Sequence, residues 1–169
     1  MTEQLLRFWP YAIGYGFALI VGQIFIGAIA KCMYTEIGIP NREHAFHSMI
    51  LGLVERVMFI ASLQVGIPQF IAIWLGIKTA GGWKHWTEEC LIPSDRDGKE
   101  IKILGRHIFN VFLTAQALSI GFAGVGWKLI EWLNKGAWAE AITVGLSVLI
   151  GATILLLMVR SNSKEATSA

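Results

Sequence analysis

The chain has 169 residues, of which 54% are hydrophobic and only 15% are charged, and its formal net charge is +2. A soluble domain averages about 25% charged residues, so this composition disfavours a soluble protein and indicates one that lies in lipid. No block of like charges occurs, and such blocks are typical of nucleic-acid binding. We therefore expect the lipid bilayer, and no nucleic acid, as a partner.

Four stretches of 19 to 21 residues carry no charged side chain. A hydrocarbon core about 30 Å thick takes roughly 20 helical residues. The chain is therefore predicted to be all-α, a single membrane domain over residues 1–169 built as a bundle of four transmembrane helices. The charge-free stretches are Pro10–Ala30, Val57–Ile77, Ile108–Trp127 and Ala141–Val159, and the spans are predicted at 10–33, 50–79, 105–130 and 138–159.

Positive charge is uneven between the two sides of this predicted bundle. The two tails and the connection between the second and third spans hold nine lysines and arginines, whereas the other two connections hold five. Cytoplasmic loops of membrane proteins are enriched in these residues. Both termini are therefore predicted in the cytoplasm (N-in/C-in), in a multi-pass protein of a bacterial inner, or cytoplasmic, membrane.

The longest segment between spans, residues 80–104, is predicted to be a cytoplasmic loop. Asp97-Gly98 favours a hairpin turn, and the alternation of Ile101 and Ile103 is typical of a strand. A small hairpin here would cap the bundle or bind a cytoplasmic protein partner. The polar tail at 161–169 is expected to be flexible.

The second span has charged residues near both ends. From Glu55 to Lys78 is about 34 Å of helix, close to the thickness of a membrane, so Glu55 and Arg56 are predicted at one mouth of the span. Residues 49–54 are also apolar, which leaves a second interpretation: the helix begins earlier and Glu55 is buried for a functional reason. Glu55 and Arg56 point about 100° apart on a helix and are not expected to pair.

Pro68 is predicted to kink this second helix, because it removes one hydrogen bond and crowds the carbonyl of Gln64. Several uncharged polar side chains are predicted near the middle of the spans. They either line a wet pathway or cross-link the helices, and the second use is the commoner one. These side chains are Gln23, Gln64, Gln116 and Ser147.

Small residues recur every four positions on three spans and predict close helix packing, within one chain or between subunits. Because four helices rarely enclose a route by themselves, a homo-oligomer is expected. The three stripes are Gly14, Ala18 and Gly22; Ala115, Ser119 and Ala123; and Thr143, Ser147 and Gly151.

Glu43, His44 and His47 have the only spacing that suits a metal. Two histidines at i, i+3 make half a site, since zinc usually takes at least three protein ligands. A polar helix entry is the simpler interpretation, so neither a metal nor another cofactor is predicted. The chain contains no GxSxG, HExxH, P-loop or GxGxxG motif, and an enzyme is not expected.

Three functions are consistent with these patterns. The leading hypothesis is a non-enzymatic, oligomeric membrane protein that forms or gates a permeation or transport path. The second is a membrane-anchored interaction subunit, whose 80–104 loop binds a protein of a defence, secretion or signalling assembly. The third is a small membrane enzyme or metal protein.

Overall fold

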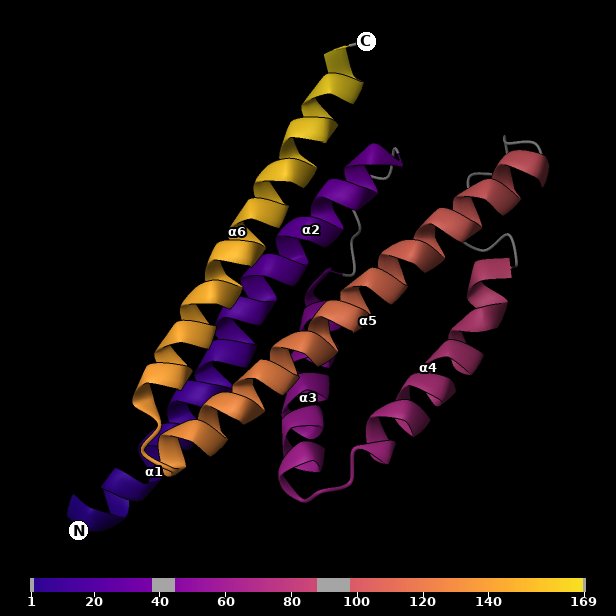
Figure 1. The fold of residues 1–169 in the computed structure, drawn as a ribbon. Helices are drawn as coiled ribbons and strands as arrows, with labels where there is room; N and C mark the ends of the chain where they lie inside the picture. Colours follow the sequence, from indigo (N-terminus) through magenta and orange to yellow (C-terminus); the bar gives the residue numbers. More distant parts are fainter. Residues whose placement is uncertain (1, 38–44, 88–97, 169) are drawn as a thin grey trace.

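The computed structural model describes residues 2–37, 45–87 and 98–168, and every regular element in these ranges is helical (Figure 1). The first rod is continuous through α1, a π-helical segment and α2. The elements are α1 (Thr2–Gly16), η1 (Phe17–Val21), α2 (Gly22–Glu36), α3 (Ala45–Gln64), α4 (Gln69–Thr87), α5 (Gly98–Asn134) and α6 (Trp138–Ser168). The all-α prediction is confirmed.

Four helical stretches are long and apolar enough to cross a membrane. They are Phe8–Glu36, Phe46–Gln64, Gly105–Asn134 and Trp138–Met158. Three of them agree with the predicted spans at 10–33, 105–130 and 138–159. Helix α4 is not among the four, because Lys78, Lys84 and His85 interrupt its apolar residues.

The predicted second span, residues 50–79, is not one helix. Helix α3 ends at Gln64, the chain turns, and α4 begins at Gln69. Gly66 has a φ of +78°, a conformation that suits glycine. The Gly66 amide donates to the Leu63 carbonyl and the Ile67 amide to the Ser62 carbonyl, which is the Schellman pattern of a helix end. Pro68 therefore precedes the first residue of a new helix, and the predicted kink inside one helix is wrong.

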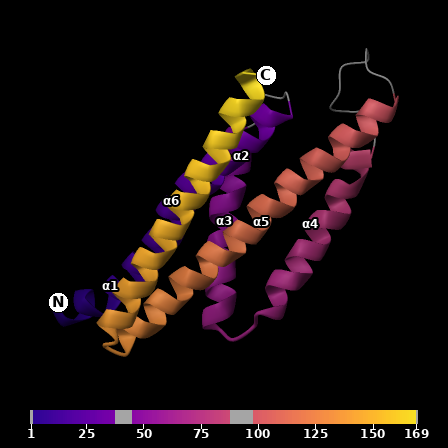
Figure 2. The ribbon, with the colours of Figure 1, turned by 45° about the horizontal axis from the view of Figure 1, so that its top comes forward.

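This turn reverses the direction of the chain. Helices α3 and α4 form a hairpin that joins at the lower end of the bundle, where α5 and α6 are also joined (Figure 1). The N-terminus lies at this lower end and the C-terminus at the upper end, and a view turned by 45° shows the same arrangement (Figure 2). The N-in/C-in prediction assumed four rods and therefore both termini at the same end. The hairpin of α3 and α4 adds one reversal of the chain, so the two termini lie at opposite ends.

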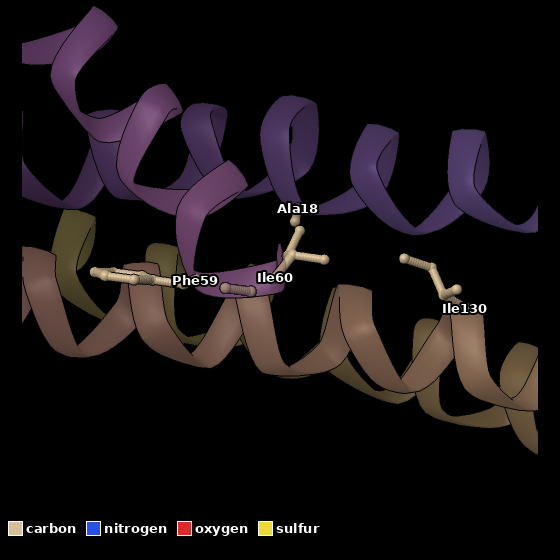
Figure 3. Packing of buried hydrophobic residues seen from close by; sticks show 5 residues of the cluster. Ala18, Phe59, Ile60 and Ile130 are labelled. Atoms are coloured by element: carbon tan, nitrogen blue, oxygen red, sulfur yellow. The ribbon is translucent and has the colours of Figure 1, made fainter. Parts of the chain in front are cut away.

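Helix α5 is the centre of the fold and packs against all the other helices. The main apolar core joins three of them: Ala18 from η1, Phe59 and Ile60 from α3, and Ile130 from α5 (Figure 3). Ala18, Phe59 and Ile60 are fully buried. Helix α6 packs on α2 and α5 and leaves much of its apolar surface exposed, as a helix that faces lipid would.

Two of the three predicted small-residue stripes pack inside the chain. Gly14, Ala18 and Gly22 are all buried, and Ser119 and Ala123 are buried on α5. The third stripe, Thr143, Ser147 and Gly151 on α6, is largely exposed. Close packing within the chain is thus confirmed for the first rod and α5, and the α6 stripe has no such role here.

The segments between and after the spans are more helical than expected. Helix α4 extends to Thr87 and α5 begins at Gly98, so much of the 80–104 segment is helix and the strand expected at residues 101–103 is helical instead. The proposed hairpin turn at Asp97-Gly98 falls partly outside the described residues. Helix α6 continues to Ser168, through the segment predicted to be a flexible tail.

The approach of α1 to α5 at Gly14 generates a test of this packing. A Cβ at Gly14 would lie 2.5 Å from the carbonyl oxygen of Gly126, a backbone atom that cannot rotate away. We expect Gly14→Ala to lower the free energy of unfolding by about 1–3 kcal/mol, the usual cost of overpacking. Thermal or denaturant unfolding in mild detergent measures this change.

Gly27→Ala in the same rod is the matched control. No atom lies within 4 Å of a Cβ at Gly27, so this change should leave stability unchanged or raise it by about 0.5–1 kcal/mol, because alanine favours a helix over glycine. Equal effects of the two changes would contradict the close approach of α1 to α5.

Candidate functional site

A buried charged cluster lies at the middle of α3. Glu55 has no exposed surface and Arg56 is 1% exposed, although both side chains are charged. They occupy the eleventh and twelfth of the 20 residues of α3, far from either helix end. The helix thus begins earlier and Glu55 is buried, as in the second interpretation, while a functional reason for this burial stays a prediction.

The carboxylate of Glu55 accepts hydrogen bonds from two other helices. On α4, Lys78 Nζ lies 2.6 Å from Oε1 and 2.8 Å from Oε2, and Trp74 Nε1 donates to Oε1 at 3.0 Å. On α5, Gln116 Nε2 donates to Oε2 at 3.1 Å. Glu55 thus joins α3, α4 and α5 through one carboxylate, whose charge is balanced by the Lys78 ammonium.

The turn at residues 65–68 is what brings Lys78 to Glu55. In one continuous helix their Cα atoms would be about 34 Å apart, whereas the hairpin places their charged atoms in contact. Lys78 keeps 21% of its side chain exposed and lies over the ring of Phe112, with Nζ 5.3 Å from the ring centroid. One side of the cluster therefore reaches the surface of the bundle.

Arg56 turns away from this carboxylate towards the first rod. Its Nη2 donates to the Oε1 of Gln23 on α2. Its Nη1 lies beside Gly22, at 3.1 Å from the position that a Cβ would take there. Gly22 and Gln23 directly follow η1, and single π-helical turns are frequent at functional sites because they displace side chains from regular helical positions.

Four buried polar atoms, three of them in the cluster and one on Ser119 of the same helix as Gln116, have no hydrogen-bond partner in the part of the chain that the structure describes. They are Nε and Nη1 of Arg56, Oε1 of Gln116 and Oγ of Ser119. Each such atom costs free energy, because the hydrogen bonds it made with water are not replaced. Donors and acceptors are both present, so these atoms can bind a polar molecule or an ion of either sign.

The other predicted site residues lie elsewhere. Gln64 is exposed at the end of α3, where its Oε1 accepts a hydrogen bond from Tyr15 at 3.2 Å. Ser147 is exposed on α6 and donates to the carbonyl of Thr143. Of the four uncharged polar residues predicted at mid-membrane, Gln23 and Gln116 thus belong to the cluster, and Gln64 and Ser147 do not.

The weak metal candidates are only partly described. Glu43 and His44 lie outside the described residues, and His47 is exposed with its ring against Phe46. Within residues 2–37, 45–87 and 98–168, no three histidine, cysteine, aspartate or glutamate side chains form a group that could hold a metal ion.

Sequence reasoning missed the roles of Lys78 and Trp74, and of Ser119 as more than a packing residue. The indole nitrogen of Trp74 donates to Glu55, a contact that the sequence alone did not indicate. Trp74 and Lys78 follow Glu55 by 19 and 23 residues. These spacings match no i, i+3 or i, i+4 pair of a helix, so the pattern gave no reason to expect a contact. The Gly66-Ile67-Pro68 order was the available signal, since it predicts a chain reversal that brings these residues together.

Comparison with known proteins gives no match: no family model fits the chain, and no curated protein and no solved structure is significantly similar to it.

The Glu55–Lys78 pair generates a stability test. Lys78→Met leaves the fully buried Glu55 carboxylate without its cation, so it should cost about 3–5 kcal/mol, as for other broken buried pairs. Glu55→Gln should cost less, because Lys78 is partly exposed and the amide still accepts a hydrogen bond. Glu55→Gln combined with Lys78→Met should be more stable than Lys78→Met alone. Unfolding in detergent compares the three variants.

Lys128→Met is the control for loss of a lysine. Lys128 pairs with Glu131 at 2.7 Å, but both side chains are partly exposed, and exposed pairs contribute little. A loss of stability in Lys128→Met as large as in Lys78→Met, or a double variant less stable than Lys78→Met, would argue against a buried pair at Glu55.

Proposed function

We propose that the protein forms a permeation or transport path for a small charged solute across a bacterial inner membrane. The cluster of Glu55, Arg56, Lys78, Gln23 and Gln116 is its central binding step. Charged residues inside membrane helices are rare and costly, and they typically mark pathways for ions or substrates. The proposed role stays non-enzymatic. Gln23 and Gln116 were already predicted at mid-membrane, and Glu55 and Arg56, predicted at a mouth, now join them in the proposed binding step.

The four buried polar atoms without partners carry this proposal. A purely structural clamp would be complete with the bonds of Glu55 to α4 and α5 and of Arg56 to α2. The unpaired atoms of Arg56, Gln116 and Ser119 add nothing to such a clamp, and they lower stability. They do support a step that exchanges partners with a passing solute, as a site that must bind and then release requires.

Homo-oligomerisation remains part of the proposal. The exposed face of α6 includes the small residues Thr143, Ser147 and Gly151, whose spacing lets another helix approach closely. A second copy on this face would extend the walls of the path. The interaction-subunit alternative depends on the 80–104 segment, and residues 88–97 of it lie outside the described part of the chain, so no contact favours it.

The direction of the five rods changes the expected topology. With the N-terminus and C-terminus at opposite ends of the bundle, we count lysines and arginines at each end. The lower end carries three: Arg7, Lys128 and Lys135. The segments at or beyond the upper ends of α2, α4, α5 and α6 carry nine: Lys31, Arg42, Lys84, Arg96, Lys99, Lys102, Arg106, Arg160 and Lys164. By the positive-inside rule, we propose that the upper end is cytoplasmic.

Reporter fusions test this topology. A reporter that is active only in the cytoplasm should be active when fused after Ala169 and inactive when fused before Met1, and a periplasmic reporter should give the reverse pattern. Fusions within the turn at residues 65–68 should report the same face as the N-terminus. Both ends on the cytoplasmic face would contradict the antiparallel pairing of α3 and α4 across the membrane.

Flux through proteoliposomes tests the path itself. Protein purified in mild detergent and reconstituted into liposomes should raise K⁺ or Cl⁻ flux, each measured separately, above that of protein-free liposomes. Gln116→Leu should lower this flux at least about tenfold, since it removes a polar group of the central step and leaves an apolar side chain in a dry site.

Gln64→Leu is the matched amide control, and its flux should equal that of the wild type because Gln64 lies outside the cluster. Detergent-solubilised samples of both variants should elute like the wild type in size-exclusion chromatography. Flux no greater than that of empty liposomes for both ions, or equal flux for Gln116→Leu and the wild type, would overturn the proposed function.

A further inference from the structure

Arg56 is the one charge of the buried cluster without an opposite charge in contact. The ion pairs of the described residues are Lys78–Glu55, Lys128–Glu131 and Lys135–Glu131, and Arg56 belongs to none of them. Its single hydrogen-bond partner is the neutral amide of Gln23. A guanidinium stays protonated in proteins, so a full positive charge is buried here with only an uncharged group as its hydrogen-bond acceptor.

Charge counting gives the sign of the missing partner. Glu55 contributes one negative charge, and Lys78 and Arg56 contribute one positive charge each, so the cluster carries a net charge of +1. Glu55 is close enough to interact with Arg56 electrostatically, but its carboxylate oxygens are already bound by Lys78, Trp74 and Gln116. An isolated charge in a low-dielectric interior is strongly disfavoured. One monovalent anion would neutralise the cluster.

The donors of Arg56 and the size of its surroundings limit the class of anion. The two groups without partners, Nε and Nη1, are N–H donors of one guanidinium. They point to opposite sides of the group, so a small anion contacts one of them, and each is a charge-assisted donor that suits an anion. A Cβ on Gly22 would lie 3.1 Å from Nη1 of Arg56 and 3.1 Å from the Phe122 side chain. Glycine at position 22 permits this close packing around Nη1, which favours a ligand of small size.

The depth of Arg56 excludes a lipid headgroup as the source of the anion. Arg56 is 1% exposed and lies near the middle of a 20-residue helix, about 17 Å from its start and about 12 Å from its end. A phosphate of a lipid headgroup stays at the membrane surface. The ligand must therefore come from solution.

We infer that Arg56 binds a small monovalent inorganic anion, such as chloride or nitrate, through an unpaired N–H group of its guanidinium, Nε–H or Nη1–H. The inference rests on the proposed function in one respect, since it names the class of solute that the central step takes. Binding itself does not require transport: an anion held permanently at Arg56 would have the same contacts.

Anion-dependent stability of the purified protein tests this site without any flux measurement. The protein in mild detergent is exchanged into sodium gluconate, and chloride or nitrate then replaces gluconate at constant ionic strength. Binding to the folded state raises the unfolding midpoint, and a tenfold excess of anion over its dissociation constant should raise it by about 3–6 °C. Intrinsic tryptophan fluorescence follows the transition.

Substitutions at two arginines assign the effect to its site. Arg56→Gln should abolish the shift, and Arg56→Lys should keep the fold and the charge while weakening the apparent affinity at least about tenfold, because the ammonium lacks the fixed N–H directions of the guanidinium. Arg106→Gln removes an exposed arginine of α5 and should keep the full shift. If Arg56→Gln does not fold, the comparison of Arg56→Lys with Arg106→Gln still decides.

The outcomes separate this inference from the proposed function. A wild-type midpoint that is equal in gluconate, chloride and nitrate, or a shift unchanged in Arg56→Lys and in every folded Arg56→Gln sample, overturns the anion site. Ion flux in proteoliposomes together with no anion-dependent shift would overturn the anion site and leave the transport proposal standing. A shift that depends on Arg56 together with no flux would support the anion site and overturn transport.

Discussion

The contact between Glu55 and Lys78 is the interaction that holds the buried charge of this fold in place. A carboxylate with no exposed surface needs a cation, and the nearest one in sequence, Arg56, points towards Gln23 of the first rod. The cation comes instead from α4, 2.6 Å from the carboxylate, and only a reversal of the chain can bring it there. The turn at residues 65–68 makes this contact possible, and the contact in turn ties α4 to α3.

The same contact explains how α4 can lie in the bundle although it carries a lysine in its middle. Its lysine at position 78 is neutralised by Glu55 and covered on one side by the ring of Phe112. Trp74, one turn earlier, adds a second hydrogen bond to the same carboxylate. Lys78 and Trp74 are thereby both bound to Glu55 inside the protein. Polar groups in lipid need such partners, because no water is there to replace them.

Much of the fold could be predicted from the sequence, because long charge-free runs have few alternatives to a membrane helix. The small-residue stripes of the first rod and α5 were also readable, since spacing by four places Gly14, Ala18 and Gly22 on one face. The chain reversal was missed because Pro68 was interpreted alone. Gly66, which has a positive φ, ends α3, and Pro68 stands just before the start of α4. Gly136 has the same conformation just before α6.

The candidate site was only half predictable, for a different reason. Gln23, Gln116, Glu55 and Arg56 could be selected as polar residues in apolar segments, whichever helices they contact. Whether such a residue is buried, exposed or paired depends on partners far away in sequence, and those are 61 residues away for Gln116 and 33 for Gln23. Gln64 and Ser147 have the same composition signal as Gln23, yet both lie exposed.

A distance between α3 and α4 in the membrane is the most direct test of this fold. Spin labels on cysteines at Leu51 and Ala80, both exposed, are introduced into a chain whose Cys32 and Cys90 are replaced by serine, and the protein is reconstituted in lipid. In the antiparallel hairpin the labels lie near the same end of the bundle, and we expect pulsed electron paramagnetic resonance to give a distance below about 30 Å. One continuous helix would give about 44 Å, and that result would remove the contact between Glu55 and Lys78.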